Sequence, residues 1–320
     1  MRYIDVFNGD ADGICALHQL RLTNPVESIL ITGVKRDISL LKQVRAESGD
    51  QITVLDISLD KNRNELLKLL DTGSKIDYFD HHFSGEIPLH PNLTTTINTS
   101  SDTCTSLLVN QHLKEEFPLW AAVGTYGDNL HGSARLVVQS LHLKESQLTS
   151  LCDLGTLLNY NSYGAKVTEL IFSPSELYLK VTPYKNPFDF INSEPAFKQL
   201  QEGYYQDFAK ASALKPELEE GQIALFMLPD KAWARRVSGV FGNQLARNYP
   251  NRAHALLTEQ EGDTYLVSIR APLNHKEGAD TLCCLFPTGG GRKAAAGINQ
   301  LPQTDLDHFI EQFRATFTFN

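Results

Sequence analysis

Hydrophobic residues in the first part of the chain form short runs that alternate with segments of helical periodicity. Strand-like apolar runs occupy residues 3–7, 28–33, 51–55 and 75–79. Helix-compatible segments lie between them, at 13–22, 37–47 and 61–71. Strands and helices that alternate every ~25 residues are typical of βαβ units. The pattern therefore predicts an α/β domain built on a parallel sheet.

The pattern changes after residue 83, where one further strand is followed by a series of helices. We expect this strand at 93–97 and the helices near 103–116, 119–127, 133–140 and 145–158. Residues 172–187 are rich in Pro, Ser and Tyr, and we expect them to carry a strand. One long helix is predicted over 194–214, because Lys215-Pro216 and the Gly-containing segment after it are typical of a helix stop.

The last part of the chain repeats the alternation of strands and helices. Strands are predicted at 222–228, 253–258 and 264–270, and helices at 238–248, at 280–286 and after residue 304. A chain of 320 residues suits two domains, since a single core rarely grows beyond ~250 to 300 residues. We therefore predict an N-terminal parallel-sheet domain over 1–185, a linker helix over 186–215 and a smaller C-terminal α/β domain over 216–320.

Composition narrows the class of protein. A hydrophobic content of 42%, without an apolar run of ~18 residues or an apolar N-terminal leader, predicts a cytoplasmic protein with no membrane span. The 5 cysteines form no C-x-x-C pair and are odd in number, which argues against a zinc cage or a disulfide framework. A net charge of −9 disfavours a broad duplex-binding surface but allows a short phosphorylated substrate.

Acidic residues come directly after several of these segments. In an open parallel sheet, residues just past the carboxyl ends of the strands converge on one crevice. Carboxylates and imidazoles crowded there would repel and desolvate one another unless divalent cations held them together. The residues concerned are Asp10, Asp12, Asp56, Asp80, His81, His82 and Asp128.

Each segment also has an ordinary explanation when it is taken alone. Asp-x-Asp-Gly at 10–13 is common in turns and calcium loops, Asp56 could cap the next helix, and Asp128 lies in a ready-made turn. The Asp-His-His triplet at 80–82 is stronger, because two imidazoles and a carboxylate after a buried strand are hard to explain by packing. His82 has the further alternative of orienting a ligand by a hydrogen bond.

Taken together, the acidic segments resemble the DHH phosphoesterase superfamily, which is named for the triplet seen at 80–82. The resemblance implies two divalent ions, usually manganese, that activate a water for attack on phosphorus. Oxygen-rich ligands with one histidine favour Mn²⁺, with Mg²⁺ as the alternative, over zinc. By this resemblance Asp12, His81 and Asp128 hold one ion, Asp10 holds the other and Asp56 bridges them, while Asp80 and His82 orient ligands or contact the phosphate.

One position departs from the superfamily pattern. Many relatives carry a metal-binding histidine four residues before the first aspartate, and Val6 stands there in this chain. Asn8 could supply a weaker oxygen ligand. We therefore expect the ion held by Asp10 to bind loosely or only together with substrate.

A glycine run marks the C-terminal domain. Successive glycine N–H groups can point into one concavity, and we expect Ala294 to Ala296 to begin a helix whose positive end adds to it. The run resembles the Gly-Gly-Gly-His-x-x-Ala-Ala-Gly signature of the DHHA1 domain, with Arg292 in place of the histidine. The strand ending at Arg270 resembles that domain's serine and arginine strand, although a surface arginine is the alternative. The predicted substrate-binding residues are Arg270, Gly289, Gly290, Gly291, Arg292 and Lys293.

These motifs together suggest a manganese-dependent phosphodiesterase. The leading hypothesis is that it hydrolyses short single-stranded oligonucleotides or small nucleotides, with the C-terminal domain seating the substrate. One alternative is a phosphoanhydride hydrolase that acts on polyphosphate or a dinucleoside polyphosphate. Another, motivated by Val6, is a catalytically silent nucleotide-binding module. The sequence leaves the oligomeric state open.

Overall fold

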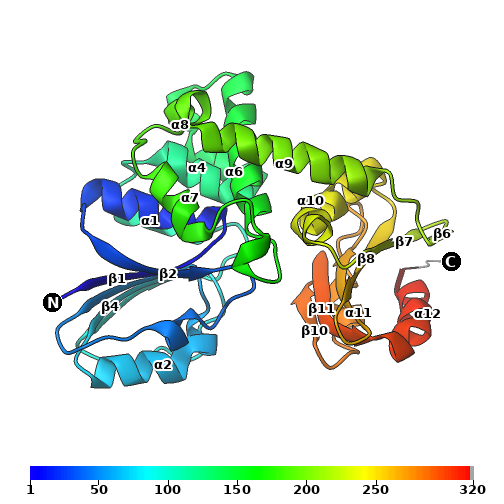
Figure 1. Cartoon of the computed structure of the whole chain (residues 1–320), viewed down its shortest axis with the longest axis horizontal. Helices are drawn as coiled ribbons and strands as arrows, with labels where there is room; N and C mark the ends of the chain where they lie inside the picture. The colour runs from blue at the N-terminus through cyan, green and yellow to red at the C-terminus, as the bar shows by residue number, and fades with distance from the viewer. Residues whose placement is uncertain (318–320) are drawn as a thin grey trace. The chain divides into compact units, whose positions relative to one another are not determined.

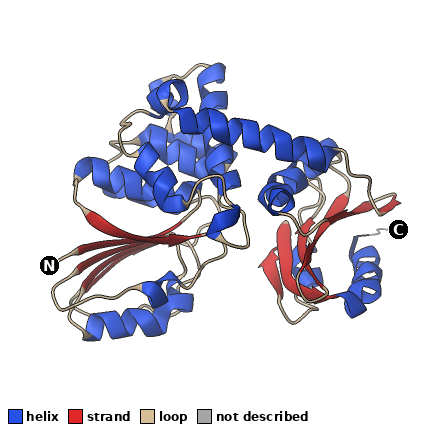
Figure 2. Ribbon diagram, viewed as in Figure 1, coloured by secondary structure: helices blue, strands red, loops and turns tan. Residues whose placement is uncertain are grey.

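The computed structural model describes residues 1–317 and divides the chain into two compact units, Met1–Gly203 and Tyr204–Asn320. Both units combine a sheet with helices, so the predicted α/β class is confirmed (Figures 1 and 2). The boundary between the units falls inside helix α9 (Pro195–Ser212). The sequence pattern predicts this helix over 194–214.

The first unit is built on a five-stranded sheet in which every pairing is parallel. The spatial order is β2-β1-β3-β4-β5, which places the carboxyl ends of β1, β3 and β4 side by side. The five strands predicted between residues 3 and 97 are confirmed. Their bounds are β1 Tyr3–Asn8, β2 Ser28–Gly33, β3 Gln51–Leu55, β4 Lys75–Asp80 and β5 Leu93–Ile97.

Helices lie on both faces of this sheet, with α2 on one face and α1, α4 and α7 on the other (Figure 1). The helices of the unit are α1 Ala11–Thr23, α2 Leu59–Asp71, α3 Thr105–His112, α4 Pro118–Gly127, α5 His131–Val137, α6 Glu145–Asn161, α7 Pro174–Val181 and α8 Pro187–Ser193. Short 3-10 turns occur at Leu40–Gln43, Gln139–Leu141 and Val167–Glu169.

Two predictions in this unit are wrong. Residues 172–187 form α7 and the start of α8 instead of a strand, because Ser173 caps the N–H of Glu176 and Pro174 occupies the first turn, where its missing N–H costs nothing. The helix expected over 37–47 is reduced to the single 3-10 turn Leu40–Gln43.

Successive side chains of each strand point to opposite faces of the sheet. On one face, Ile4, Val6 and Tyr78 pack with Leu66 of α2 and Leu40, and all five are buried. Each such side chain contributes about 1.5–3 kcal/mol by leaving water. This continuous apolar layer fixes the strands in register and so fixes where their carboxyl ends lie.

The second unit contains a six-stranded mixed sheet in the order β10-β11-β9-β8-β7-β6. Only β7 and β8 pair in parallel; the other pairs are antiparallel. The elements are β6 Leu218–Glu220, β7 Ile223–Leu228, α10 Ala232–Asn248, β8 Ala253–Gln260, β9 Thr264–Arg270, α11 Ala279–Cys283, β10 Gly289–Arg292, β11 Ala295–Pro302, the 3-10 turn Gln303–Asp305 and α12 Leu306–Phe317.

The helix predicted to follow the glycine run is a strand in the structure. Ala295 and Ala296 belong to β11, which pairs with β10 on one side and with β9 on the other. Pairing on both edges outweighs the helix propensity of alanine, which is a weak preference beside tertiary contacts. No helix among residues 1–317 is long and apolar enough to cross a membrane.

Candidate metal centre

The carboxyl ends of three neighbouring strands position most of the predicted metal ligands. Asp10 follows β1 as the N-cap of α1, Asp56 follows β3, and His81 follows β4. Asp128 reaches the same place from the C-terminal end of α4. The site therefore lies at the end of a parallel sheet where such folds place their ligands.

The turn between β1 and α1 holds two carboxylates in fixed orientations. Asp10 accepts hydrogen bonds from the backbone N–H groups of Asp12 and Gly13, at 3.0 and 3.1 Å. The two oxygens of Asp12 accept from the N–H groups of Thr105 and Ser106, each at 2.7 Å, at the start of α3. A Cβ at Gly13 would lie 2.2 Å from the carbonyl oxygen of Asn8. The close turn therefore requires glycine.

Asp56 has a left-handed backbone, with φ of 59°, which is unusual for a residue other than glycine. Its N–H donates to the carbonyl of Phe79 at 3.0 Å, and the Thr105 hydroxyl donates to its Oδ1 at 3.2 Å. Such conformations cost about 1–3 kcal/mol and are concentrated at functional sites. The strained turn directs the Asp56 carboxylate toward His81.

His81 has the geometry of a metal ligand. Its Nδ1 lies 3.1 Å from the carbonyl oxygen of Thr103, which can only accept, so Nδ1 carries the proton. The lone pair is therefore on Nε2, which lies 3.4 Å from Asp56 Oδ1 and 3.4 Å from Asp128 Oδ2. A hydrogen bond that fixes the tautomer and ring orientation is typical of metal-bound histidines.

Two sets of side chains among residues 1–317 bring donor atoms within 4.8 Å of one another: Asp12 with His81 and Asp128, and Asp56 with His81 and His82. Oxygen donors with imidazole nitrogen suit Mn²⁺ or Mg²⁺. The Oδ2 atom of Asp80 is buried and has no hydrogen-bond partner in the described part of the chain. The donor set and this unpartnered oxygen both fit a bound divalent cation.

The electrostatics of the centre point in the same direction. Burial raises the pKa of Asp56 well above its usual range, and the negative charges of Asp10, Asp12, Asp128 and Asp80 raise it further. Burial also raises the pKa of Asp128, although Lys35 opposes this shift. Both carboxyl groups thus resist ionisation in the protein alone, and a cation would remove that penalty.

His82 and Asp80 form a pair beside these ligands. His82 Nδ1 lies 2.7 Å from Asp80 Oδ1, and the His82 side chain is 41% exposed. Burial disfavours the charged imidazole, but the hydrogen bond and charge of Asp80 outweigh it and raise the pKa of His82 above 6.5. His82 is the solvent-accessible member of a buried pair, a position suited to contact with a bound phosphate.

The two atypical positions of β1 have structural roles. Val6 is fully buried in the core layer that packs on α2. The Asn8 side chain donates to the carbonyl of Lys35 at 3.2 Å and accepts from the N–H of Asp10 at 3.3 Å. Asn8 therefore joins the turn after β1 to the loop after β2.

Lys35 is a site residue that sequence reasoning missed. Its ammonium donates to Asp10 Oδ2 and, at 2.9 Å, to Asn159 Oδ1, and it lies 3.4 Å from Asp128 Oδ1. Burial works against its charge, but Asp10, Tyr163 and Asp128 raise its pKa well above the usual range. The available signal was its place just past β2, at the same sheet edge as the aspartates.

The predicted substrate-binding residues of the second unit lie on neighbouring strands. The register aligns Arg292 of β10, Ala295 of β11 and Arg270 of β9 in one row across the sheet. Arg270 is held by a hydrogen bond from Nε to Asn243 Oδ1 at 2.7 Å. Lys293 forms an exposed ion pair with Glu277 at 3.2 Å.

The glycine run itself is part of β10. The sequence predicts that the N–H groups of Gly289 to Gly291 point into one concavity. Because these residues pair with β11, their N–H groups alternate in direction instead. Close packing explains Gly289, where a Cβ would lie 1.7 Å from the carbonyl oxygen of Cys283, and the φ of 146° at Gly291 favours glycine there.

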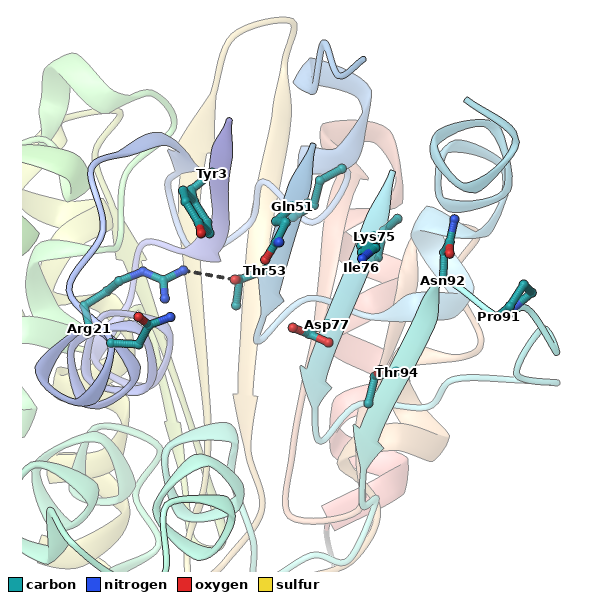
Figure 3. A pocket seen from close by; sticks show the side chains of 12 residues that line it. Tyr3, Arg21, Gln51, Thr53, Lys75, Ile76, Asp77, Pro91, Asn92 and Thr94 are labelled. Carbon is teal, nitrogen blue, oxygen red and sulfur yellow. Dashed lines mark hydrogen bonds between the residues drawn. The ribbon is translucent and has the colours of Figure 1, made fainter. Parts of the chain in front are cut away.

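A hollow of about 280 Å³ lies at the opposite, amino end of the first sheet (Figure 3). It is lined by polar side chains that include Tyr3, Gln51 and Asp77. Arg21 donates to the Thr53 hydroxyl at 3.0 Å across this surface (Figure 3). None of the predicted metal ligands lines it, so it is separate from the metal centre.

Comparison with known proteins identifies the fold. No protein-family model and no curated protein sequence matches the chain. Among solved structures, an exonuclease RecJ bound to manganese is 15% identical with a TM-score of 0.62, covering 98% of this chain and 89% of that one. RecJ of Thermus thermophilus in complex with Mn²⁺ is 16% identical with a TM-score of 0.63, and the 98% of this chain that aligns spans 51% of its length.

A pGpG-specific phosphodiesterase, PggH from Vibrio cholerae, is similar over its full length. It is 14% identical with a TM-score of 0.57, and the alignment covers 99% of both chains. These likenesses establish the fold of the chain. They confirm the fold that the sequence resemblance to DHH and DHHA1 domains implies.

Proposed function

We propose that the chain is a metal-dependent phosphodiesterase that hydrolyses short oligonucleotides or small nucleotides. The observation that carries the proposal is the convergence of Asp12, His81 and Asp128, whose donor atoms lie within 4.8 Å of one another. Asp12 is buried and Asp128 is half-buried, and the raised pKa of Asp128 favours a bound cation. The neighbours of known structure with this fold include a manganese-bound exonuclease and a phosphodiesterase.

We assign the metal-holding role to Asp10, Asp12, Asp56, His81 and Asp128, and we name Mn²⁺ as the cation, with Mg²⁺ as the alternative. When bound, the metal would supply Lewis-acid polarisation of the phosphoryl group and activation of water. Asp12 is oriented by the start of α3, and His81 by the Thr103 carbonyl, so both ligands are held in place before the metal binds.

Asp80 and His82 act on the substrate in this proposal. The raised pKa of His82 favours the protonated imidazole, and its exposed edge can donate to a phosphate or leaving-group oxygen. Asp80 stabilises that charge through its hydrogen bond to Nδ1. The pair therefore supplies a proton donor beside the metal ligands.

The second unit binds substrate phosphates in this proposal. Arg270 and Arg292 occupy one row across three strands, so two guanidinium groups start from positions on either side of β11. Guanidinium groups bind phosphate with two parallel hydrogen bonds. The glycines at 289–291 keep that surface free of side chains, and Lys293 adds a charge that Glu277 partly offsets.

Short substrates are favoured over long duplexes. The net charge of −9 opposes the counterion-release binding on which proteins rely to hold long nucleic acids. The pGpG-specific enzyme, whose substrate is a dinucleotide, is similar to this chain over 99% of both lengths. A dinucleotide or similarly short strand therefore suits the proposal.

The test is hydrolysis of labelled di- to pentanucleotides, pGpG included, by metal-free protein to which Mn²⁺ is added. We expect turnover only when the metal is present. His81→Ala should lower the turnover rate on the order of 10³-fold, because His81 belongs to both sets of metal-binding side chains. His90→Ala, which removes an imidazole from the loop before β5, should behave as wild type. Equal turnover by His81→Ala would reject the assignment. Release of phosphate from polyphosphate or a dinucleoside polyphosphate, with oligonucleotides left intact, would favour the phosphoanhydride alternative.

A further inference from the structure

The loop after β2 delivers a fixed positive charge to the centre of the acidic cluster. The Lys35 ammonium contacts Asp10 and Asn159 and lies 3.4 Å from Asp128. Only 25% of the Lys35 side chain is exposed. The charge therefore sits among the carboxylates, at the place where a second cation would have to bind Asp10.

Contacts along the whole residue hold Lys35 in this position. Its N–H donates to the carbonyl of Ser162 at 3.0 Å, and its carbonyl accepts from Asn8 at 3.2 Å. Its ammonium also lies 5.7 Å from the centroid of the Tyr163 ring. A side chain anchored at its backbone and at its tip is preorganised, so its charge stays in place without a bound ligand.

Both oxygens of Asp10 are engaged in contacts within the protein. One oxygen accepts from the N–H groups at the start of α1, and the other accepts from Lys35. Asp10 belongs to neither set of converging donor atoms in the described part of the chain. Val6, four residues before Asp10, is buried in the core and offers no ligand atom.

We propose that the Lys35 ammonium takes the place of a second divalent cation beside Asp10. The two donor sets share His81, which offers one ligand atom, so the centre then binds one cation, at Asp12, His81 and Asp128, and Lys35 supplies the remaining positive charge. A divalent ion at Asp10 would lie against this ammonium and be repelled by it. This inference rests on the proposed function; it sets the number of metal ions at one and makes Asp10 a partner of Lys35 instead of a metal ligand.

The experiment counts bound Mn²⁺ on the metal-free full-length protein by titration calorimetry and by electron paramagnetic resonance. Two Mn²⁺ ions about 4 Å apart give a broadened, spin-coupled spectrum, whereas a single ion gives an uncoupled one. We expect one equivalent and an uncoupled spectrum for wild type and for Lys35→Arg. Lys35→Ala should bind a second, weaker equivalent and show spin coupling.

Lys180→Ala is the matched control, because this lysine also lies over an aromatic ring, that of Phe172 at 5.2 Å, but contacts none of the proposed ligands. It should bind one equivalent. Lys35→Met keeps most of the side-chain volume and replaces Lys35→Ala if circular dichroism shows that the alanine variant does not fold.

Two equivalents with a spin-coupled spectrum in wild type would overturn the inference and leave the proposed phosphodiesterase intact. One equivalent in a folded Lys35→Ala or Lys35→Met would also overturn it, since Lys35 would then not be what excludes the second ion. An absence of Mn²⁺ binding in wild type would reject the inference and the proposed function together.

Discussion

A single buried acid, Asp5, lies toward the amino end of β1 and a cluster of acids lies past its carboxyl end, and the two are neutralised differently. At the amino end, Asp5 is fully buried, and Arg21 contacts both of its oxygens, with Nε at 2.9 Å from Oδ2. The Ser28 hydroxyl adds a hydrogen bond at 2.6 Å. This carboxylate is matched by one guanidinium within the same unit, as a structural ion pair must be.

At the carboxyl end, the carboxylates outnumber the positive groups. Asp56 is surrounded by Asp10, Asp12, Asp80 and Asp128, and Lys35 is the lysine that contacts this cluster. Burial, together with the neighbouring negative charges, raises the pKa values of Asp56 and Asp128. The comparison teaches that a buried acid with a matched partner supports the fold, whereas acids short of positive charge indicate a cation site.

The largest expected difference between the two ends is in activity. Asp56→Asn should lower kcat on the order of 10³-fold in saturating Mn²⁺, because it removes a charge that faces His81. Asp5→Asn should leave kcat per folded molecule unchanged. Initial rates on the same oligonucleotide, corrected for the folded fraction, make the comparison. A similar loss of kcat in both variants would contradict the division into functional and structural acids.

Stability should respond in the reverse order. Asp5→Asn should lower the free energy of unfolding by about 3–5 kcal/mol, because it leaves the Arg21 guanidinium, which is only 12% exposed, without its partner. Asp56→Asn should raise the stability of the metal-free protein, since it removes a carboxylate that resists ionisation. Urea unfolding in EDTA measures both. A metal-free Asp56→Asn less stable than wild type would break the comparison.

The stability gained by Asp56→Asn in EDTA should depend on pH. Because the folded pKa of Asp56 is raised, its stabilising contribution is complete below the ordinary aspartate pKa of about 3.9 and is lost as pH rises through the folded value. The gap between variant and wild type should therefore widen above about pH 4, by up to about 1.4 kcal/mol per pH unit. Thermal melts from pH 4 to 8 measure it. With saturating Mn²⁺ the sign should reverse.

The smallest expected effects come from removing single hydrogen bonds to Asp5 and Asp56. Ser28→Ala removes a donor to Asp5 and should lower the free energy of unfolding by about 2 kcal/mol without changing kcat. Thr105→Val removes a donor to Asp56 and should lower kcat by about 10-fold while changing metal-free stability by less than about 1 kcal/mol. Rates and urea curves for both variants complete the comparison. Equal stability losses would show that the two acids are held alike.

The sequence was sufficient for most of the fold because its strands are short apolar runs bounded by polar segments. The runs at 3–7, 51–55 and 75–79 lie in the core layer, so periodicity alone locates them. The prediction from sequence failed at 294–297. Alanines favour a helix in isolation, but here β9 and β10 pair with the two edges of this segment and make it a strand. Long-range pairing of this kind leaves no local signal.

In the candidate site, too, local sequence predicts some residues, whereas others depend on contacts between distant segments. Asp56 and His81 were predictable because each comes directly after an apolar strand, and the topology places those strand ends together. Lys35 was not, because a lysine in a loop ordinarily faces solvent, and only the contacts from Asn159 and Ser162, distant in sequence, turn it inward. The start of α7 could have been predicted, because Ser173 and Pro174 are a common N-cap and first residue of a helix.

The contacts of Asp12 bear on how this protein would change if its chemistry were lost. Its carboxylate caps α3 across more than ninety positions of chain through Thr105 and Ser106. A descendant with no catalytic duty would still be selected to keep this aspartate for folding, whereas nothing would preserve the strained Asp56. A related sequence that has lost Asp56 but kept Asp12 would therefore be expected to keep the fold without the hydrolytic activity.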